Sequence, residues 1–121
     1  MIQNNPLVSI LLLSMNHEAY IEQCIRSIAD QTYQNIEVIY LDNASSDNSF
    51  QKGKTLLEHS GLRFKCFSNK DSKTISANLN FLFDQSSGAF IAPLSTDDWF
   101  EKSNIEKKVN MKKNKQHVTG S

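Results

Sequence analysis

Residues 6–49, PLVSILLLSMNHEAYIEQCIRSIADQTYQNIEVIYLDNASSDNS, contain two apolar runs separated by a helical pattern. Val8–Leu13 is almost wholly apolar, as expected of a strand covered on both faces. Between His17 and Asp30, apolar side chains recur at helical spacing and polar ones occupy the opposite face. Ile36–Leu41 is rich in β-branched residues and predicts a second strand. A strand, a helix and a strand in this order predict two parallel strands joined by a right-handed crossover.

The alternation of strand and helix patterns continues along the rest of the chain. Two more strands are predicted at Leu62–Phe67 and Phe90–Leu94. The further predicted helices are Ser49–His59, Ile75–Gln85 and Glu101–Lys115, the last of which is weakly apolar. This order predicts an α/β fold, a Rossmann-like three-layer sandwich with helices on both faces of a parallel sheet. Residues 1–121 are expected to form a single domain. We expect the chain to stop inside, or just after, one half of a larger domain.

The composition is that of an ordinary globular chain. Among the 121 residues, 13 basic and 13 acidic side chains give a formal net charge of zero. Because a neutral chain has no overall field that attracts polyanions, we expect no nucleic-acid partner. The longest apolar run, Leu7–Leu13, is too short to span a bilayer and lacks the basic flank of a signal peptide. We therefore expect a cytoplasmic chain with Cys24 and Cys66 reduced in its core.

Positive charge is concentrated near the C-terminus. Between Glu101 and Lys115 there are six lysines and two glutamates. The usual structure for such a run is the solvated face of a helix. The alternative is a peripheral contact with a membrane, which would place the chain at the inner face of that membrane.

The strongest chemical signal is the acidic pair in GAFIAPLSTDDWF, residues 88–100. Asp97 and Asp98 follow the predicted strand Phe90–Leu94, at the sheet edge where α/β folds bind ligands. Two adjacent carboxylates repel each other unless a cation or a donor-rich ligand compensates them. The alternative is that one of the two aspartates caps the helix that follows, because aspartate is a favoured N-cap residue.

Asp42 ends the second predicted strand and should therefore reach the same crevice as Asp97 and Asp98. Three carboxylates beside asparagine, serine and threonine side chains suit a hydroxyl-rich ligand and a hard divalent cation. Mg²⁺ or Mn²⁺ would use one or two of the carboxylates and take its remaining ligands from phosphates and water. The sequence leaves open which of Asp97 and Asp98 binds the metal.

Several other kinds of site are excluded by the motifs. The four glycines form neither a dinucleotide-binding nor a P-loop pattern, and no hydrolase nucleophile elbow is present. His17, His59 and His117 are scattered and are interpreted as surface or capping residues. A receiver-like signalling domain would need an acidic pair after the first strand, where this chain has Ser14 and Met15.

Residues 6–49 resemble the opening of family 2 glycosyltransferases. In that family a strand ends in a T-Y-N-like turn, a helix ends S-(I/V)-x-x-Q-T-Y, and the second strand ends V-D-D-G-S-x-D. A later block of the family, N-x-x-x-A-x-N…G-x-(Y/F)-I…x-x-D-D, is also similar here. The resemblance runs from about Pro6 to Phe100, and its most specific residues are Gln31-Thr32-Tyr33, Asp42, Asn69, Ala77-Asn78, Gly88–Ile91 and Thr96-Asp97-Asp98.

The resemblance implies an A-type glycosyltransferase fold that binds a nucleotide sugar, expected to be a UDP-sugar. It implies inverting transfer to a glycan or lipid-linked acceptor, as in polysaccharide biosynthesis. Asp42 would bind the base edge, and Asp97 with Asp98 would bind the ribose and hold Mg²⁺ or Mn²⁺ on the diphosphate. The predicted nucleotide-sugar site is Leu13, Ser14, Met15, Asn16, Asp42, Asn78, Thr96 and Asp97, and the predicted metal ligands are Asp97 and Asp98.

Three residues depart from the family pattern. Met15 replaces the aromatic residue that commonly packs on the base, Ser95 replaces the first acidic residue of the D-x-D motif, and Ala77 replaces an arginine. The family's catalytic base lies in the acceptor-binding half, so it is expected beyond Ser121. The chain is therefore predicted to bind nucleotide and metal without efficient turnover. The alternative is a noncatalytic nucleotide- or partner-binding module of the same fold.

Overall fold

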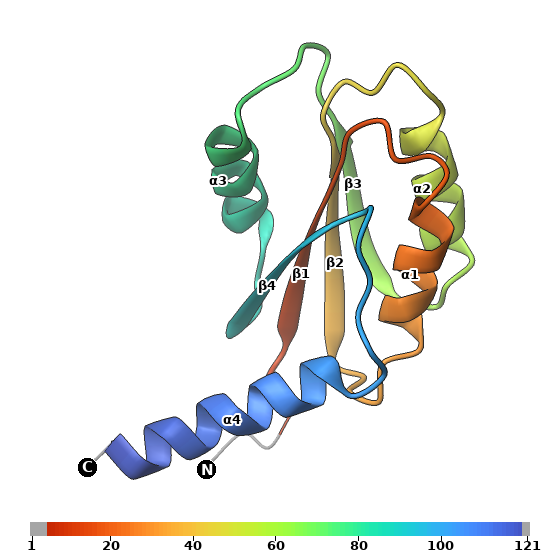
Figure 1. Ribbon diagram of the computed structural model, residues 1–121. Coiled ribbons are helices and arrows are strands. Elements are labelled where there is room, and N and C mark those ends of the chain that lie inside the picture. The colour runs from red at the N-terminus through yellow and green to blue at the C-terminus, as the bar shows by residue number, and fades with distance from the viewer. Residues whose placement is uncertain (1–4, 120–121) are drawn as a thin grey trace.

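The computed structural model describes residues 5–119, with side chains as far as Met111. Four parallel strands form one sheet in the order β3-β2-β1-β4 (Figure 1). The strands and helices alternate along the chain as β1 (Val8–Ser14), α1 (Ile21–Ala29), β2 (Ile36–Asp42), α2 (Ser49–Glu58), β3 (Arg63–Ser68), α3 (Ile75–Gln85), β4 (Phe90–Ser95) and α4 (Asn104–Thr119). The predicted α/β fold is confirmed.

Three layers result from the alternation of side chains along the central strand. In β1, Ile10 and Leu12 face the layer formed by α1 and α2, and Leu11 faces α3 on the opposite side of the sheet (Figure 1). All three leucine and isoleucine side chains are at most 3% exposed. Because successive strand residues point to opposite faces, an unbroken apolar run is what a sheet covered on both faces requires.

The weakly apolar last helix nevertheless contributes to the core. Ile105 and Val109 of α4 are 1% and 2% exposed and belong to the same cluster as the α1 side chains. The two residues lie four positions apart, which places them on one face of a helix. The lysines of this helix that the structure describes, Lys107 and Lys108, are exposed.

Two helices begin later than predicted. The first begins at Ile21 rather than His17, because the backbone amides of His17 and Glu18 donate to the side chains of Ser49 and Asp47. The last begins at Asn104 rather than Glu101. Contacts with distant segments set these starts. The helical spacing of apolar residues in the sequence carries no information about such contacts.

Gln31 ties the end of α1 to the beginning of α4. Its amide nitrogen donates to the carbonyl oxygens of Ser27 and Glu101, at 3.0 and 2.6 Å, and its amide oxygen accepts from the Ile105 backbone at 3.0 Å. The backbone amide of Thr32 donates to the Lys102 carbonyl at 2.8 Å. The segment between β4 and α4, which carries Asp97 and Asp98, is therefore fixed at its far end by the residues that follow α1.

Candidate nucleotide-sugar site

The carboxyl ends of the strands meet at one edge of the sheet, and hydrogen bonds continue past each strand end. Ser14 is in register with Asp42, and Leu13 with Ser95. Beyond these pairs, backbone amides continue the ladder in the loops: Thr96 donates to Leu13, Asn43 to Ser14 and Asn69 to Asp42, at 2.8 to 3.0 Å. The loops predicted to carry the site therefore start from fixed, adjacent positions.

Asp42 lies at the centre of a hydroxyl cluster. Its Oδ1 atom accepts from the hydroxyls of Ser14 and Ser45, each at 2.5 Å, and its Oδ2 atom accepts from the Ser45 backbone amide at 2.9 Å. The Ser14 hydroxyl also lies 2.7 Å from the hydroxyl of Tyr40. A carboxylate offers about four acceptor positions, so three protein contacts leave one unused.

The loop after β1 is locked to the loop after β2 by Asn16. This residue has a left-handed backbone, with φ of 57°, a conformation that asparagine tolerates better than most residues. Its side-chain oxygen accepts from the backbone amides of Ser46 and Asp47, at 2.8 and 3.4 Å. In return, the Asn16 backbone amide donates to the Ser45 hydroxyl at 2.9 Å. The strained conformation thus has a local function, because it holds the turn against the Asp42 loop.

A network of three asparagines fixes the loop after β3. The side-chain oxygen of Asn43 accepts from the amides of Asn69 and Lys73, each at 2.9 Å, and its nitrogen donates to the Lys73 carbonyl at 3.0 Å. Asn69 also donates to the side-chain oxygen of Asn78 at 2.9 Å. Asn78 is 1% exposed, so the structure places this predicted site residue beneath the loop as a support.

The acidic pair lies on the surface beside His17. The imidazole Nδ1 of His17 is 2.8 Å from the hydroxyl of Thr96, and its Nε2 is 3.7 Å from Oδ2 of Asp97. Thr96 is fully buried, and the Asp97 side chain is 51% exposed. Asp98 is exposed as well, and its Oδ1 accepts from the Trp99 backbone amide at 2.8 Å. Both carboxylates of the pair remain accessible to a ligand.

The helix-capping alternative for Asp97 and Asp98 is wrong. The helix that follows begins at Asn104, well beyond either aspartate. His17, interpreted from the sequence as a surface or capping histidine, has a side chain that is 22% exposed; its carbonyl accepts from the Ile21 amide at the start of α1, and its ring also contacts the loop after β4. Its place directly after the first strand was the one signal that could have indicated this position.

The predicted site residues divide into an accessible group and a supporting group. Met15, Asn16, Asp97 and Asp98 are exposed at the sheet edge. Ser14, Asp42, Asn78 and Thr96 are buried and are held by hydrogen bonds within the protein. The side chain of Leu13 packs in the apolar cluster on the α3 face. The structure thus brings the loops together, with four of these side chains exposed at the sheet edge and four buried beside it.

A divalent cation would need ligands from outside the protein. Among the side chains that the structure describes, no group of three or more histidine, cysteine or acidic residues is arranged to hold a metal ion. Two accessible carboxylates nevertheless fit a metal that completes its coordination with phosphate oxygens and water, as Mg²⁺ does in many nucleotide sites. No helix of the described part of the chain is both long and apolar enough to cross a membrane.

The comparison with known families decides the assignment. The family model described as glycosyl transferase family 2 matches residues 9–121. This chain belongs to family 2 of the glycosyltransferases. The membership that the resemblance implied is therefore confirmed, and it excludes the receiver-domain alternative.

Curated relatives support the membership of this family 2 chain. It is 36% identical over 119 residues to an uncharacterized glycosyltransferase of Haemophilus influenzae, covering 97% of this chain and 36% of the relative. It is 37% identical over 105 residues to the Escherichia coli UDP-Glc:alpha-D-GlcNAc-diphosphoundecaprenol beta-1,3-glucosyltransferase WfgD, covering 87% of this chain and 40% of that enzyme. The chain therefore spans well under half the length of these relatives.

Solved structures show the same fold. Mannosyltransferase PcManGT from Pyrobaculum calidifontis, solved with GDP-Man and Mn²⁺, superposes with a TM-score of 0.74 at 21% identity. That match covers 79% of this chain and 29% of the mannosyltransferase. TarS from S. aureus, residues 1–349 with UDP-GlcNAc, superposes with a TM-score of 0.77 at 22% identity, covering 92% of this chain and 32% of TarS. The family 2 chain thus has the A-type glycosyltransferase fold that its sequence predicts.

Proposed function

We propose that this chain forms the donor-binding part of a glycosyltransferase that transfers a sugar from a UDP-sugar to a glycan or lipid-linked acceptor. Inverting transfer is assisted by Mg²⁺ or Mn²⁺ held on the diphosphate by Asp97 and Asp98. In this proposal Asp42 accepts a hydrogen bond from the base, and residues 13–16 line the base and ribose pocket. The proposal also includes work at the inner face of a membrane.

The observation that carries the proposal is the junction formed by the loop after β1. Ser14, at its start, donates to Asp42, and His17, at its end, contacts Thr96 and Asp97. One short loop therefore connects two parts of the site. At its start is the buried carboxylate of Asp42, which has an unused acceptor position, and at its end are the accessible carboxylates of the acidic pair. A nucleoside diphosphate needs both groups in one site: a hydrogen-bond acceptor for its base and a cation site for its phosphates.

The relatives support both the proposed donor and the proposed acceptor. PcManGT was solved with GDP-Man and Mn²⁺, and TarS with UDP-GlcNAc, so enzymes of this fold bind nucleotide sugars. The name of WfgD specifies UDP-Glc as donor and a sugar diphosphoundecaprenol as acceptor. A lipid-linked acceptor is therefore proposed beside a free glycan. When bound, the metal would neutralise charge that develops on the departing nucleotide diphosphate.

Calorimetry with UDP and Mn²⁺ tests the site directly. We expect saturable binding by the chain that is abolished by a chelator, and at least about tenfold weaker binding by Asp97→Ala and Asp98→Ala, since each removes a charged ligand. Asp84→Ala, an exposed aspartate of α3, is the matched control and should bind like the unmodified chain. Equal binding by all four proteins would contradict the assignment of the acidic pair.

A transfer assay with the same chain separates the enzyme from the noncatalytic module. A panel of UDP- and GDP-sugars is incubated with Mn²⁺, and release of UDP or GDP is followed with and without glycan acceptors. Acceptor-dependent release would support the transferase. Binding without release fits both the noncatalytic module and a donor half that requires further sequence, and the same assay on the natural full-length chain distinguishes the two.

A further inference from the structure

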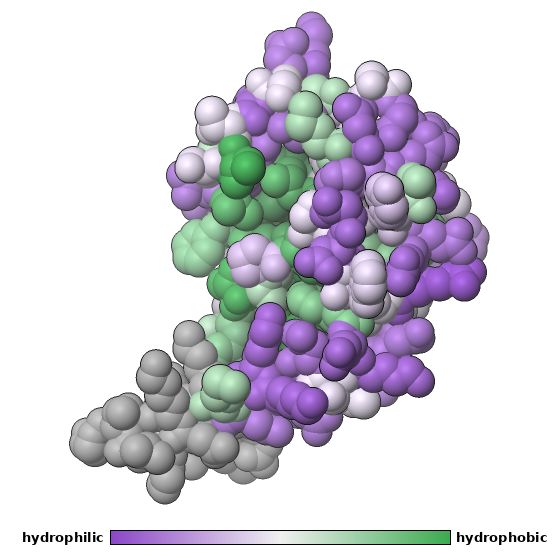
Figure 2. Space-filling view, in the orientation of Figure 1, coloured by the Kyte–Doolittle hydropathy of each residue, from purple (hydrophilic) through white to green (hydrophobic). Residues whose placement is uncertain are grey.

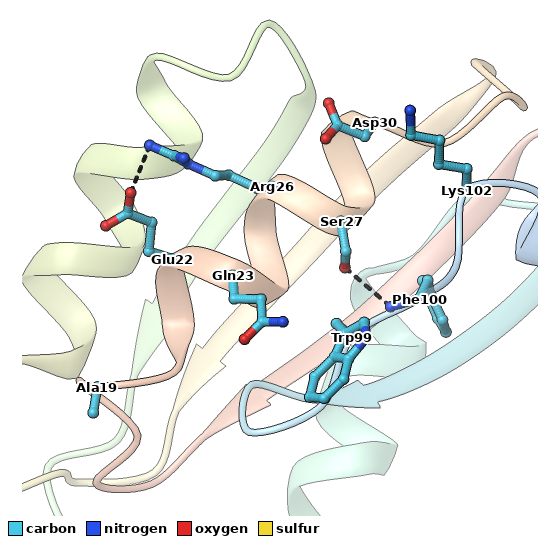
Figure 3. Close-up of a pocket in the computed structure, with 9 residues that line it drawn as sticks. All are labelled: Ala19, Glu22, Gln23, Arg26, Ser27, Asp30, Trp99, Phe100 and Lys102. Carbon is cyan, nitrogen blue, oxygen red and sulfur yellow. Dashed lines mark hydrogen bonds and ion pairs between the residues drawn. The ribbon is translucent and has the colours of Figure 1, made fainter.

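A groove runs along the exposed face of α1, next to the segment that carries the acidic pair. It has a volume of about 490 Å³ and is lined on one side by α1 and on the other by Trp99, Phe100 and Lys102 (Figure 3). This volume lies within the range of small-molecule sites, roughly 300–1,000 Å³. The surrounding α1 and α2 side of the molecule is mainly hydrophilic (Figure 2).

The groove has fixed walls. The backbone amide of Phe100 donates to the Ser27 hydroxyl at 3.0 Å, which holds the segment after β4 against the middle of α1. The Phe100 side chain is 8% exposed and belongs to the core. Gln31 holds the same segment one helical turn further on, through the Glu101 carbonyl. The groove is therefore a preformed feature of the fold.

Trp99 is the unusual member of the lining. It is 53% exposed, although burial of an indole is strongly favourable. Among the residues that the structure describes, no ring or cation stacks on it. Gln23 and Ser27 project from α1 toward this ring (Figure 3). An indole face beside an amide and a hydroxyl is an apolar platform bordered by hydrogen-bonding groups.

The remaining lining groups are balanced in charge. Glu22 and Arg26 neutralise each other through an ion pair of 2.6 Å. Asp30 and Lys102 supply one further charge of each sign, and in the described part of the chain neither they nor Gln23 make a side-chain hydrogen bond or ion pair. A groove with two acidic and two basic groups favours a neutral ligand over an anionic one. Its free donors and acceptors favour a ligand with many hydroxyls.

We propose that this groove binds a neutral hexopyranose unit of the glycan acceptor. The C–H face of the sugar ring would pack on the electron-rich face of Trp99. Its hydroxyls would bond to the free side chain of Gln23, and a second sugar unit further along α1 would reach Asp30 and Lys102 at the far end of the groove (Figure 3). Trp99 directly follows Asp98, so a sugar on this ring would extend from the acidic pair along α1. The assignment of this sugar to the acceptor rests on the proposed function, whereas sugar binding by the groove does not.

Trp99 is the only tryptophan of the chain, so its indole N–H gives a single resonance in nitrogen-edited NMR spectra. The whole chain is titrated with cellotriose, chitotriose and mannotriose. We expect at least one trisaccharide to shift this resonance saturably, and Gln23→Ala and Asp30→Ala to weaken that binding about tenfold each, the loss of one hydrogen bond. Gln51→Ala, an exposed glutamine of α2, is the matched control and should bind like the unmodified chain.

Calorimetry with UDP and Mn²⁺ on the same proteins separates the two proposals. Nucleotide binding without any trisaccharide shift would overturn the groove and leave the donor site intact. A saturable trisaccharide shift without nucleotide binding would support the groove and overturn the donor site. An equal shift in the unmodified chain and in both groove variants would overturn the groove, since the sugar would then bind elsewhere.

Discussion

His17 shows how one side chain can connect distant parts of the site. It lies 79 positions from Thr96 in the sequence, yet its Nδ1 atom is 2.8 Å from the Thr96 hydroxyl. Its backbone amide is held by the Ser49 hydroxyl at the start of α2. A single residue thus contacts the start of α2 and the loop that follows β4, and it does so beside Asp97.

Replacement of His17 by alanine should destabilise the chain measurably. The change leaves the fully buried Thr96 hydroxyl without its ring partner, which costs about 1–3 kcal/mol of unfolding free energy. Urea denaturation measures the loss. His59→Ala is the matched control, because its ring contacts only the Thr55 carbonyl of its own helix at an exposed position. Equal losses for the two variants would contradict a role for His17 in joining the loops.

Asp47 should make stability depend on pH under acidic conditions. Burial alone would raise the pKa of this carboxyl, but the hydrogen bonds from Ser49 and from the Glu18 backbone outweigh it and lower the pKa below its ordinary value of 3.8. A lowered folded-state pKa means that the carboxylate stabilises the fold above pH 3.8, and that this contribution is lost as pH falls through the folded-state pKa.

The urea midpoint measured against pH tests this contribution. Asp47→Asn should be less stable than the unmodified chain near neutral pH, and the difference should shrink steadily below pH 3.8. Asp84→Asn, on the exposed surface of α3, is the matched control. A difference for Asp47→Asn that is constant with pH would show that its hydrogen bonds do not depend on ionisation.

At the scale of elements, the Gln-Thr-Tyr motif connects one helix to another. Gln31 is 5% exposed and contacts Ser27, Glu101 and Ile105, and the hydroxyl of Tyr33 donates to the Pro6 carbonyl. The motif is therefore a structural connection between the end of α1, the chain before β1 and the start of α4. Gln31 lies far from Glu101 and Ile105 in the sequence, so the sequence alone does not reveal this role.

Gln31→Ala should loosen the start of α4 in particular. The loss of three hydrogen bonds at a buried position is expected to cost about 1–3 kcal/mol of unfolding free energy, and hydrogen exchange at the Ile105 amide should accelerate. Gln51→Ala serves as the control, because its amide contacts only Thr55 on an exposed helix face. Unchanged exchange at Ile105 in Gln31→Ala would show that α4 is held by its apolar contacts alone.

The sequence was sufficient for the order and type of the elements because their patterns are local. Six of the seven residues from Leu7 to Leu13 are apolar, and only Ser9 interrupts them. Ends and roles were harder to predict. The late start of α1 results from bonds to Ser49 and Asp47, and the burial of Asn78 results from its contact with Asn69 across a loop. Neither contact leaves a periodic signal.

At the scale of the whole molecule, both cysteines report on the integrity of the core. Burial is the main cause that raises the pKa of Cys24 to about 12, with smaller contributions from Asp98 and Asp97. Burial likewise raises the pKa of Cys66 to about 11. Since the thiolate is the reactive form, both thiols should be almost inert in the folded chain near neutral pH.

Labelling with iodoacetamide at mildly alkaline pH measures this protection. Neither cysteine should react appreciably in the folded chain, and both should react readily in guanidinium chloride, where a free thiol has a pKa of about 8.5. Mass spectrometry of the digested protein separates the two sites. Rapid labelling of Cys24 in the absence of denaturant would contradict the tight packing of α1 against the sheet.

The attachment of the acidic segment has a consequence for ligand-driven motion. Its beginning is bonded to His17, its middle to Ser27 and its end to Gln31, and these three residues lie before, in and after α1. Asp97 and Asp98 should therefore move with α1 as one rigid body. Any closure over a bound nucleotide would have to come from the loop after β3. That loop, residues 69–74, is held by hydrogen bonds to the side-chain amide of Asn43.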